Sequence, residues 1–414
     1  MVPLPDRPPS LRLLLASSFV DGYNLIVIAP FLLLYGASVG TLPTWLVAVL
    51  SISAILGNLV GGLLLGHLGD LFGRRRVFLW DVGFFVVMPL LSAFAPSLLL
   101  LAAFRFLLGV GIGGNYPLAS VLLSETSPAS SRGSRVALLG LSWTAGALTS
   151  YALGALLFPL GSLALPILFL AVVPPAVVVV VLRQRLSESG EWHRQMSGRT
   201  LRERMSRASV GRLAESGIRK GTTYAAGFWF LFDIVQYGVS LFLPLLLVAF
   251  GHLHGRSALM VSALLYSGEL LGTLVGIRLV DVVGRRTLQL TGFAAMAAGL
   301  LLAAAFPLSS ALLLLLLLFL VTTGVGVGPG IMEFVYPPEL FPTEIRATGS
   351  GFALTMSRLG AFIGILVVPV LFATVVDSTR YLFLLYGAIA VGAFLLTWSL
   401  APETRGLPLT GADA

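Results

Sequence analysis

Twelve long apolar runs dominate this sequence of 414 residues and limit what it can fold into. A helix that crosses a lipid bilayer needs about 20 mostly apolar residues. The chain is 57% hydrophobic and only 11% charged, whereas a soluble domain carries about 25% charged residues. Lipid offers no partner to an open backbone, and the runs are too long for barrel strands, so we expect twelve spanning helices. They cover residues 12–36, 44–68, 77–95, 97–123, 135–158, 163–182, 222–250, 257–280, 287–306, 310–336, 348–374 and 380–400.

The basic residues are distributed unevenly between the connecting loops. Arginines follow alternate runs, whereas the loops at residues 37–43, 95–97 and 158–161 carry no charge. Short basic loops stay on the cytoplasmic side of a membrane. We therefore expect an integral protein of the plasma membrane with both termini in the cytoplasm. The arginines on that side are Arg74, Arg75, Arg76, Arg132, Arg135, Arg285, Arg286, Arg346 and Arg405, with Arg256 and Arg380 as exceptions on the other.

An internal repeat relates the two halves of the chain. A shift of 211 residues aligns Gly57 with Gly268 and Asp70 with Asp281. Similar spacings over several runs predict parallel six-helix repeats, with a solute site between them near the middle of the membrane. The expected fold is an all-α membrane protein with twelve transmembrane helices in two pseudo-symmetric six-helix bundles.

The composition changes once along the chain, between the two halves. Residues 183–220 are polar and rich in Arg and Ser. We expect bundles at residues 1–182 and 221–414, joined by this basic cytoplasmic linker. Its charges either fix the topology as a solvated linker or touch anionic membrane lipid.

A repeated charged motif connects the second and third runs. Residues Gly66–Arg76 read GHLGDLFGRRR, and residues Asp281–Arg286 repeat the pattern as DVVGRR in the matching loop. This motif resembles the signature of the major facilitator superfamily of membrane transporters. Its glycines let helix ends approach closely, and its acidic and basic groups can pair across the cytoplasmic face. We expect gating residues at Asp70, Gly73, Arg74, Arg75, Asp281, Arg285, Arg286, Glu125, Arg132, Glu339 and Arg346.

Four further segments are similar to particular branches of that family. Residues Arg105–Leu118 resemble the fourth helix of sugar porters and of phosphate:proton symporters, and Trp229–Gly238 resembles the seventh helix of the phosphate symporters. Pro402–Gly406 is similar to the C-terminal signature of sugar porters, and Leu186–Trp192 to the signature after their sixth helix. The resemblance extends over nearly the whole chain.

Asp21 lies near the middle of the first run. A charge at this depth is costly and is therefore a functional candidate. Phosphate symporters carry an acidic residue at the matching position, and the resemblance implies a role in proton movement. The alternative is a structural partner for Arg105 or for a backbone break near Gly22; by depth, Asn24 is the nearer partner of Arg105.

Asp233 and Arg358 come from the seventh and eleventh runs, both near mid-depth. A guanidinium can grip an oxyanion with two parallel hydrogen bonds, and Arg358 stands where phosphate symporters carry a Lys that meets substrate. The alternative is a static ion pair between these two residues. The expected substrate-binding residues are Asp233, Arg358, Tyr237, Trp229, Tyr116, Asn115, Asn24 and Gln236.

Two positions depart from the phosphate symporters, and two acidic residues match nothing in them. Asn115 and Gly330 stand where that branch has Asp and Asn. The Asn115 amide cannot carry a proton, so either coupling uses Asp21 alone or the solute is not phosphate. Glu269, in the middle of the eighth run, is expected to be a second proton-coupling residue beside Asp21, a partner of Arg358, or a structural hydrogen-bond acceptor. We expect Glu333 near the cytoplasmic end, in a gating or structural role, and Trp143 in packing.

The predicted function is proton-coupled symport of a small polar or anionic solute, phosphate-like or an organic anion, by alternating access. The alternative is a sugar or other organic-solute porter of the sugar-porter branch, including a uniporter, although the seventh run offers only Gln236 where sugar porters have paired Gln. We do not expect a non-transporting receptor of the same fold, whose hallmark would be long terminal domains, because the tails of this sequence are short. The chain has no Cys, four His and no nucleotide loop, so we expect no enzyme activity, no metal and no cofactor apart from the coupling protons. We expect a monomer that binds no nucleic acid.

Overall fold

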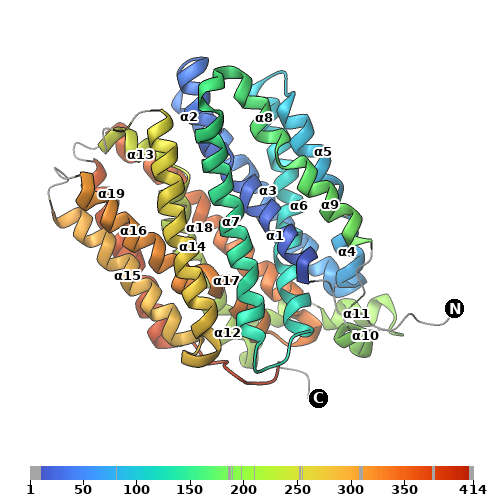
Figure 1. Ribbon diagram of the computed structural model, residues 1–414. Coiled ribbons are helices and arrows are strands. Elements are labelled where there is room, and N and C mark those ends of the chain that lie inside the picture. Colours follow the sequence, from blue (N-terminus) through green and yellow to red (C-terminus); the bar gives the residue numbers. More distant parts are fainter. Residues whose placement is uncertain are drawn as a thin grey trace.

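The computed structural model describes residues 11–80, 82–184, 188, 190–196, 198–208, 210–250, 253, 255–306, 311–374 and 378–409. These residues form helices and connecting turns, without strands (Figure 1). The helices of the first half are α1 Leu11–Ile26, α2 Ile28–Ser38, α3 Thr44–Phe72, α4 Arg74–Trp80, α5 Val82–Ala93, α6 Leu98–Glu125, α7 Arg132–Leu157, η1 Phe158–Leu163, α8 Ala164–Leu170 and α9 Val173–Arg183. Those that follow are α10 Gly190–Met196, α11 Leu201–Arg207, η2 Val210–Ala214, α12 Ser216–Ser240, α13 Leu243–Phe250, α14 Arg256–Val283, α15 Arg285–Ala305, α16 Ala311–Val327, α17 Pro329–Leu340, η3 Thr343–Ile345, α18 Arg346–Thr374 and α19 Ser378–Leu400.

The membrane-spanning segments agree with the apolar runs. Ten segments of the described chain are long and apolar enough to cross a membrane. One of them, Arg132–Arg183, has 52 residues and reverses direction at Gly161, whose positive φ of 57° suits glycine. It therefore contains two spans, and α12 with α13 forms the remaining one. The expected all-α membrane fold is confirmed.

Proline explains where several spans are broken. A proline ring clashes with the carbonyl group four residues earlier and cannot donate to it. Helix α1 ends four residues before Pro30, α8 ends four residues before Pro174, and α12 ends four residues before Pro244. In the tenth span, Pro329 begins α17 directly after Gly328, which has non-helical angles. The first span of each half is therefore broken at an equivalent place.

The helices form two groups that lie side by side in Figure 1. Helices α1 to α9 make the first bundle and α12 to α19 the second. Two pairs of helices join the bundles along their length: α3 packs on α18, and α7 packs on α14. The repeat relates one pair to the other, because α3 matches α14 and α7 matches α18.

Glycine allows this seam between the bundles to be close. The carbonyl oxygen of Gly62 on α3 lies so near Gly351 on α18 that a side chain at Gly351 would collide with it. A side chain at Gly66 would meet the Ala347 carbonyl oxygen at 2.7 Å. Small residues serve the same purpose between other membrane helices.

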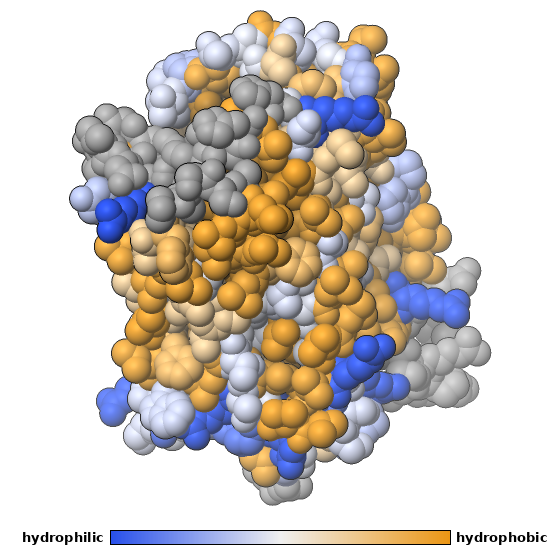
Figure 2. Space-filling model, turned by 60° about the vertical axis from the view of Figure 1, so that its left-hand side comes forward, coloured by the Kyte–Doolittle hydropathy of each residue, from blue (hydrophilic) through white to orange (hydrophobic). Residues whose placement is uncertain are grey.

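Apolar side chains cover much of the outer surface, as Figure 2 shows for one face. Leu264 and Leu271 on α14, and Leu316 on α16, are more than half exposed. In water such an exposed surface would be unfavourable. The surface is therefore suited to lipid. We call the end of the molecule that carries Arg74, Arg132, Arg285 and Arg346 the basic end.

Candidate functional site

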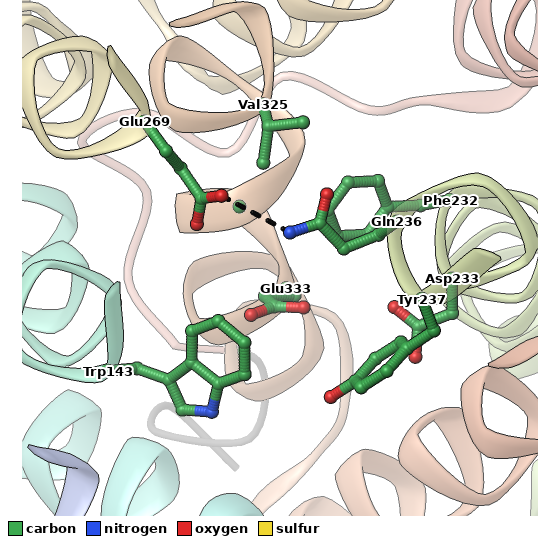
Figure 3. A pocket seen from close by; sticks show the side chains of 9 residues that line it. Trp143, Phe232, Asp233, Gln236, Tyr237, Glu269, Val325 and Glu333 are labelled. Atoms are coloured by element: carbon green, nitrogen blue, oxygen red, sulfur yellow. Dashed lines mark hydrogen bonds between the residues drawn. The ribbon is translucent and has the colours of Figure 1, made fainter. Parts of the chain in front are cut away.

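A small cavity lies between the bundles (Figure 3). Its volume is about 10 Å³, which is room for about one water molecule. One wall comes from the first bundle through Trp143 on α7, and the others come from the second bundle. The lining residues are Trp143, Phe232, Asp233, Gln236, Tyr237, Glu269, Val325, Gly330 and Glu333.

Asp233 lines this cavity and forms with Arg358 the ion pair that the sequence offered as the alternative to substrate binding. Arg358 donates to Asp233 Oδ2 at 2.9 Å, and each side chain is only 1% exposed. The guanidinium also lies 5.0 Å from the ring centre of Tyr237 and 5.8 Å from that of Tyr116. Asp233 Oδ1 has no hydrogen-bond partner within the described residues. The pair therefore retains capacity for a further hydrogen bond.

Glu269 links the two bundles at the level of the cavity. Its carboxylate accepts from the Thr144 hydroxyl on α7 at 2.9 Å and from the Gln236 amide at 3.2 Å. Of the roles considered above, the structural hydrogen bond is present, while no contact with Arg358 is seen in the described chain. Figure 3 shows this carboxylate on the same side of the cavity as Val325.

Glu333 also lines the cavity, which corrects the sequence-based expectation that it lies near the cytoplasmic end. The Tyr116 hydroxyl donates to it from α6. The tenth run was expected to end at residue 336, but α17 continues to Leu340, so Glu333 lies farther from the end of the span. Together with Glu269, this residue makes a second contact between the bundles through a carboxylate.

Aromatic rings surround these charged groups. Tyr116 stacks on Phe334 at 4.3 Å and lies 5.5 Å from Trp229 between ring centres. The indole nitrogens of Trp229 and Trp143 have no hydrogen-bond partner among the described residues. Trp143, expected in packing, thus contributes a lining wall, and both indoles have a donor to offer a bound molecule.

Asp21 lies in a different environment, inside the first bundle. It accepts a hydrogen bond from the Asn115 side-chain amide, and Asn115 Oδ1 accepts from Arg183 at 2.5 Å. Neither Asp21 nor Asn115 is among the residues that line the cavity. Asn115 and Tyr116 are consecutive on α6, so Asn115 reaches this group while Tyr116 contacts Glu333, which lines the cavity.

The composition of residues 183–220 assigns Arg183 to the basic linker. In the structure this side chain is instead fully buried at the end of α9. It lies 3.9 Å from the ring centre of Phe78 and donates to the Phe78 carbonyl oxygen at 2.9 Å. A lone Arg at the end of an apolar run carries no signal that separates a buried group from a topology-setting one.

Asn24 and Arg105 lie together but apart from the cavity. Arg105 donates to the backbone carbonyl oxygens of Asn24 at 3.0 Å and Leu25 at 3.4 Å. The expected proximity to Asn24 is therefore present. The Asn24 side chain is buried and has no hydrogen-bond partner within the described part of the chain, and it is not a lining residue.

Two acidic residues of the repeated motif close the basic end. Asp70 on α3 accepts from the backbone N–H of Ala347 at 3.3 Å and of Thr348 at 2.7 Å, in the first turn of α18. Asp281 on α14 accepts from the N–H of Gly133 at 3.1 Å and of Ser134 at 2.8 Å, in the first turn of α7. The free N–H groups and the dipole of a helix N-terminus favour such carboxylates. Each bundle thus caps a helix of the other.

Buried arginines complete this closure on the α3 side. Arg74 pairs with Asp70 at 3.1 Å and with Glu125 at 3.3 Å. Glu125 also accepts from Arg346 of the second bundle at 2.8 Å. These four side chains are fully buried, so the charges form one connected group across the seam.

The α14 side repeats the arrangement. Arg285 pairs with Asp281 at 3.0 Å and with Glu339 at 3.0 Å. Glu339 also lies 3.8 Å from Arg132 of the first bundle. The eleven predicted gating residues therefore include two matched sets of charges that hold the bundles together at the basic end.

Two glutamates that were not among the predicted gating residues support these sets. Glu188 accepts from the backbone N–H of Arg74 and Arg75, and Glu403 accepts from that of Arg285 and Arg286. In both places the preceding glycine has positive φ, 104° at Gly73 and 100° at Gly284, as a tight turn between helices requires. Glu403 belongs to the segment Pro402–Gly406 noted above, whereas parts of Leu186–Trp192 lie outside the described residues.

The sequence model of the Major Facilitator Superfamily matches residues 13–365 and 230–413 of this chain. The chain belongs to the major facilitator superfamily. Together with the membrane fold, this membership makes the protein an integral membrane transporter and not an enzyme.

Named relatives of this major facilitator protein include transporters of different solutes. It is 29% identical to the inner membrane metabolite transport protein YgcS of Escherichia coli, over 95% of this chain and 90% of that protein. It is 27% identical to the niacin transporter NiaP of Acinetobacter baylyi over 88% and 86% of the chains. It is 28% identical to the probable inorganic phosphate transporter 1-10 of Oryza sativa over 84% and 77%.

Solved structures show the same fold. The proton:xylose symporter XylE, bound to 6-bromo-6-deoxy-D-glucose, matches 96% of each chain with a TM-score of 0.81 and 21% identity. At this identity the likeness concerns the fold of the major facilitator family and leaves the solute open.

The gate of this major facilitator protein can be tested with a single introduced thiol, because the chain has no Cys. Ala347→Cys places a probe on the seam, where Ala347 is fully buried. Asp281→Asn removes the charge that caps α7 on the opposite seam. Charge-assisted hydrogen bonds contribute about 1.5–3 kcal/mol, so we expect maleimide labelling of the introduced thiol to become roughly tenfold faster.

The matched control is Glu215→Gln, a change of an exposed linker carboxylate, which should leave the labelling rate of the same probe unchanged. Equal labelling rates in the Asp281→Asn variant and in this control would contradict a role of the α7 cap in closing the basic end.

Proposed function

We propose that this transporter moves a small organic anion together with protons, by alternating access. The observation that carries the proposal is the charge of the central cavity. Asp233, Glu269 and Glu333 line it. Arg358, which pairs with Asp233, is the one cation that we find paired with any of these carboxylates within the described residues. The site is therefore acidic unless carboxylates are protonated.

The solute class follows from the cation and the rings. Arg358 can bind a carboxylate with two parallel hydrogen bonds, and Tyr116, Trp229 and Trp143 offer flat faces and two free indole donors. A planar or apolar body with one carboxylate suits such walls. Inorganic phosphate would need donors on all its oxygens. The relative NiaP, named as a niacin transporter, supports a carboxylate attached to a ring.

Proton coupling follows from the balance of charge. An unpaired charge buried in a low-dielectric site is costly, and such a group neutralises itself by changing its protonation. Binding an anion beside three carboxylates adds another negative charge. We propose that Glu269 takes up a proton on the cavity side and that Asp21 acts as a second proton site, which α6 connects to the cavity through Asn115 and Tyr116.

The closed basic end supports alternating access. Breaking the contacts of Asp70 and Asp281 with the opposite bundle would open the cavity to that side. We propose that the basic end faces the cytoplasm of a cell with this protein in its plasma membrane, since basic loops face inward. One chain lines the cavity completely, so we propose a monomer as the transport unit.

The test is uptake into liposomes with an imposed pH gradient. Radiolabelled nicotinate should accumulate when the outside is acidic, and a protonophore should abolish the accumulation. Asp21→Asn should lower pH-driven accumulation at least about tenfold, because its amide cannot carry a proton. Uptake that does not depend on the pH gradient would contradict proton coupling. Accumulation at the wild-type rate by the Asp21→Asn variant would show that Asp21 has no part in proton coupling.

A sugar is the second candidate, which the resemblance of the segment Pro402–Gly406 to the sugar-porter signature favours. Against it, the Gln236 amide already bonds Glu269, which leaves few groups for sugar hydroxyls. A thermal-shift screen of nicotinate, phosphate and xylose separates the classes, because a ligand at 100 times its Kd stabilises the folded state by about 2.7 kcal/mol.

A further inference from the structure

A second cavity lies at the basic end of the second bundle, between the linker and the membrane helices. Its volume is about 470 Å³. We call it the linker cavity. Its walls come from η2, from the first turns of α12 and from Phe352 on α18, through Val210, Leu213, Ala214, Arg219, Thr222, Thr223, Ala226 and Phe352.

The side chains of α12 that line the linker cavity change in character along the helix. Arg219, Thr222, Thr223 and Ala226 are spaced by three, four and seven residues, so they lie on one face. From Arg219 to Ala226 the helix rises by about 10 Å. The order is a cation at the basic end, hydroxyl groups in the middle, and an apolar surface deeper in the membrane.

The wall formed by α18 extends inward over a similar length of helix. Phe352 lies six residues after Arg346, the first residue of α18, and is therefore about 9 Å from that end of the helix. The cavity thus reaches from the level of the charged helix ends into the apolar layer. A small ion or a polar solute would find no partners at the deep end.

A hydrogen bond holds η2 against α12 beside the linker cavity. The Thr222 hydroxyl on α12 donates to the Leu213 carbonyl oxygen of η2 at 3.0 Å. Outside the cavity, Arg212 pairs with Glu215 at 3.3 Å, while Arg219 and the neighbouring Lys220 are exposed. The rim is therefore positively charged.

We propose that the linker cavity binds one anionic phospholipid from the adjacent leaflet. Its phosphate lies at Arg219, its glycerol esters lie beside the two threonines, and one acyl chain packs against Ala226 and Phe352. The gradient from cation to apolar wall follows the order of groups in a phospholipid. Because η2 belongs to the segment that joins the bundles, the bound lipid ties this segment to the second bundle.

The test is native mass spectrometry of the full chain titrated with phosphatidylglycerol or phosphatidylcholine. The wild type should retain one phosphatidylglycerol in preference to phosphatidylcholine. Arg219→Gln should weaken phosphatidylglycerol binding about fivefold, the effect of one basic residue near an anionic lipid. Arg202→Gln removes an exposed Arg of α11 that does not line the cavity, and it should bind as the wild type does.

Ala226→Trp is a second variant, which fills the deep end and leaves every charge in place. It should abolish the retained lipid while its melting temperature in phosphatidylcholine stays within a few degrees of the wild type. Equal retention of the two lipids by the wild type would overturn the proposal. Equal losses of phosphatidylglycerol binding in Arg219→Gln and Arg202→Gln would also overturn it, as would full retention of this lipid by Ala226→Trp.

Discussion

Replacing Arg358 by Gln will abolish uptake and destabilise the fold, and adding Asp233→Asn will restore stability without restoring uptake. The single change leaves the Asp233 carboxylate buried without its cation, which costs about 3–5 kcal/mol. The double change removes both charges, so the destabilisation largely disappears. If Arg358 binds the solute, uptake falls at least about 100-fold in both variants, because two charge-assisted hydrogen bonds are lost.

This pair of variants separates the two roles considered for Asp233 and Arg358. Stability is measured by thermal unfolding in detergent without solute, and transport by counterflow of nicotinate in liposomes, which needs no proton gradient. Arg358→Lys serves as a control that keeps the charge but not the two parallel hydrogen bonds. Recovery of transport in the double variant would show that the ion pair is only structural.

The spans of the fold could be predicted well from the sequence because lipid imposes a simple rule on apolar length. The breaks within the spans could also have been predicted, since Pro30, Pro174 and Pro244 each lie four residues after the last residue of a helix. The position of Glu333 was wrong because the tenth run was expected to end at residue 336, whereas α17 continues to Leu340.

The central site was only partly predictable. Asp233 and Arg358 could be paired because both charges lie at mid-depth in neighbouring spans. The separate group formed by Asp21, Asn115 and Arg183 could not be foreseen, because it depends on which face of α6 each side chain occupies. Helix rotation follows from packing against neighbours, and the composition of a nearly uniformly apolar run contains little information about it.

Removing the carboxylates of Glu269 and Glu333 together should uncouple transport from protons. In the variant Glu269→Gln with Glu333→Gln, the cavity keeps only the Asp233–Arg358 pair, which is neutral. Solute can then bind without proton uptake. We expect counterflow of nicotinate to continue, while accumulation driven by an acidic exterior falls at least about tenfold, because no unpaired carboxylate is left to be neutralised by a proton.

The pH dependence gives the same test with a defined sign. In the wild type, raising the pH removes protons that the acidic cavity needs before an anion can enter, so nicotinate binding should weaken as pH rises. The variant Glu269→Gln with Glu333→Gln has no excess carboxylate at the cavity, and its binding of nicotinate should not change with pH. Glu215→Gln, an exposed linker change, should behave as the wild type. If the double variant keeps the full pH dependence and Asp21→Asn loses it, the protons are carried inside the first bundle and not at the cavity. Coupling would then depend on Asp21, which is connected to Glu333 at the cavity through Asn115 and Tyr116 of α6. It would not depend on the number of carboxylates around the solute.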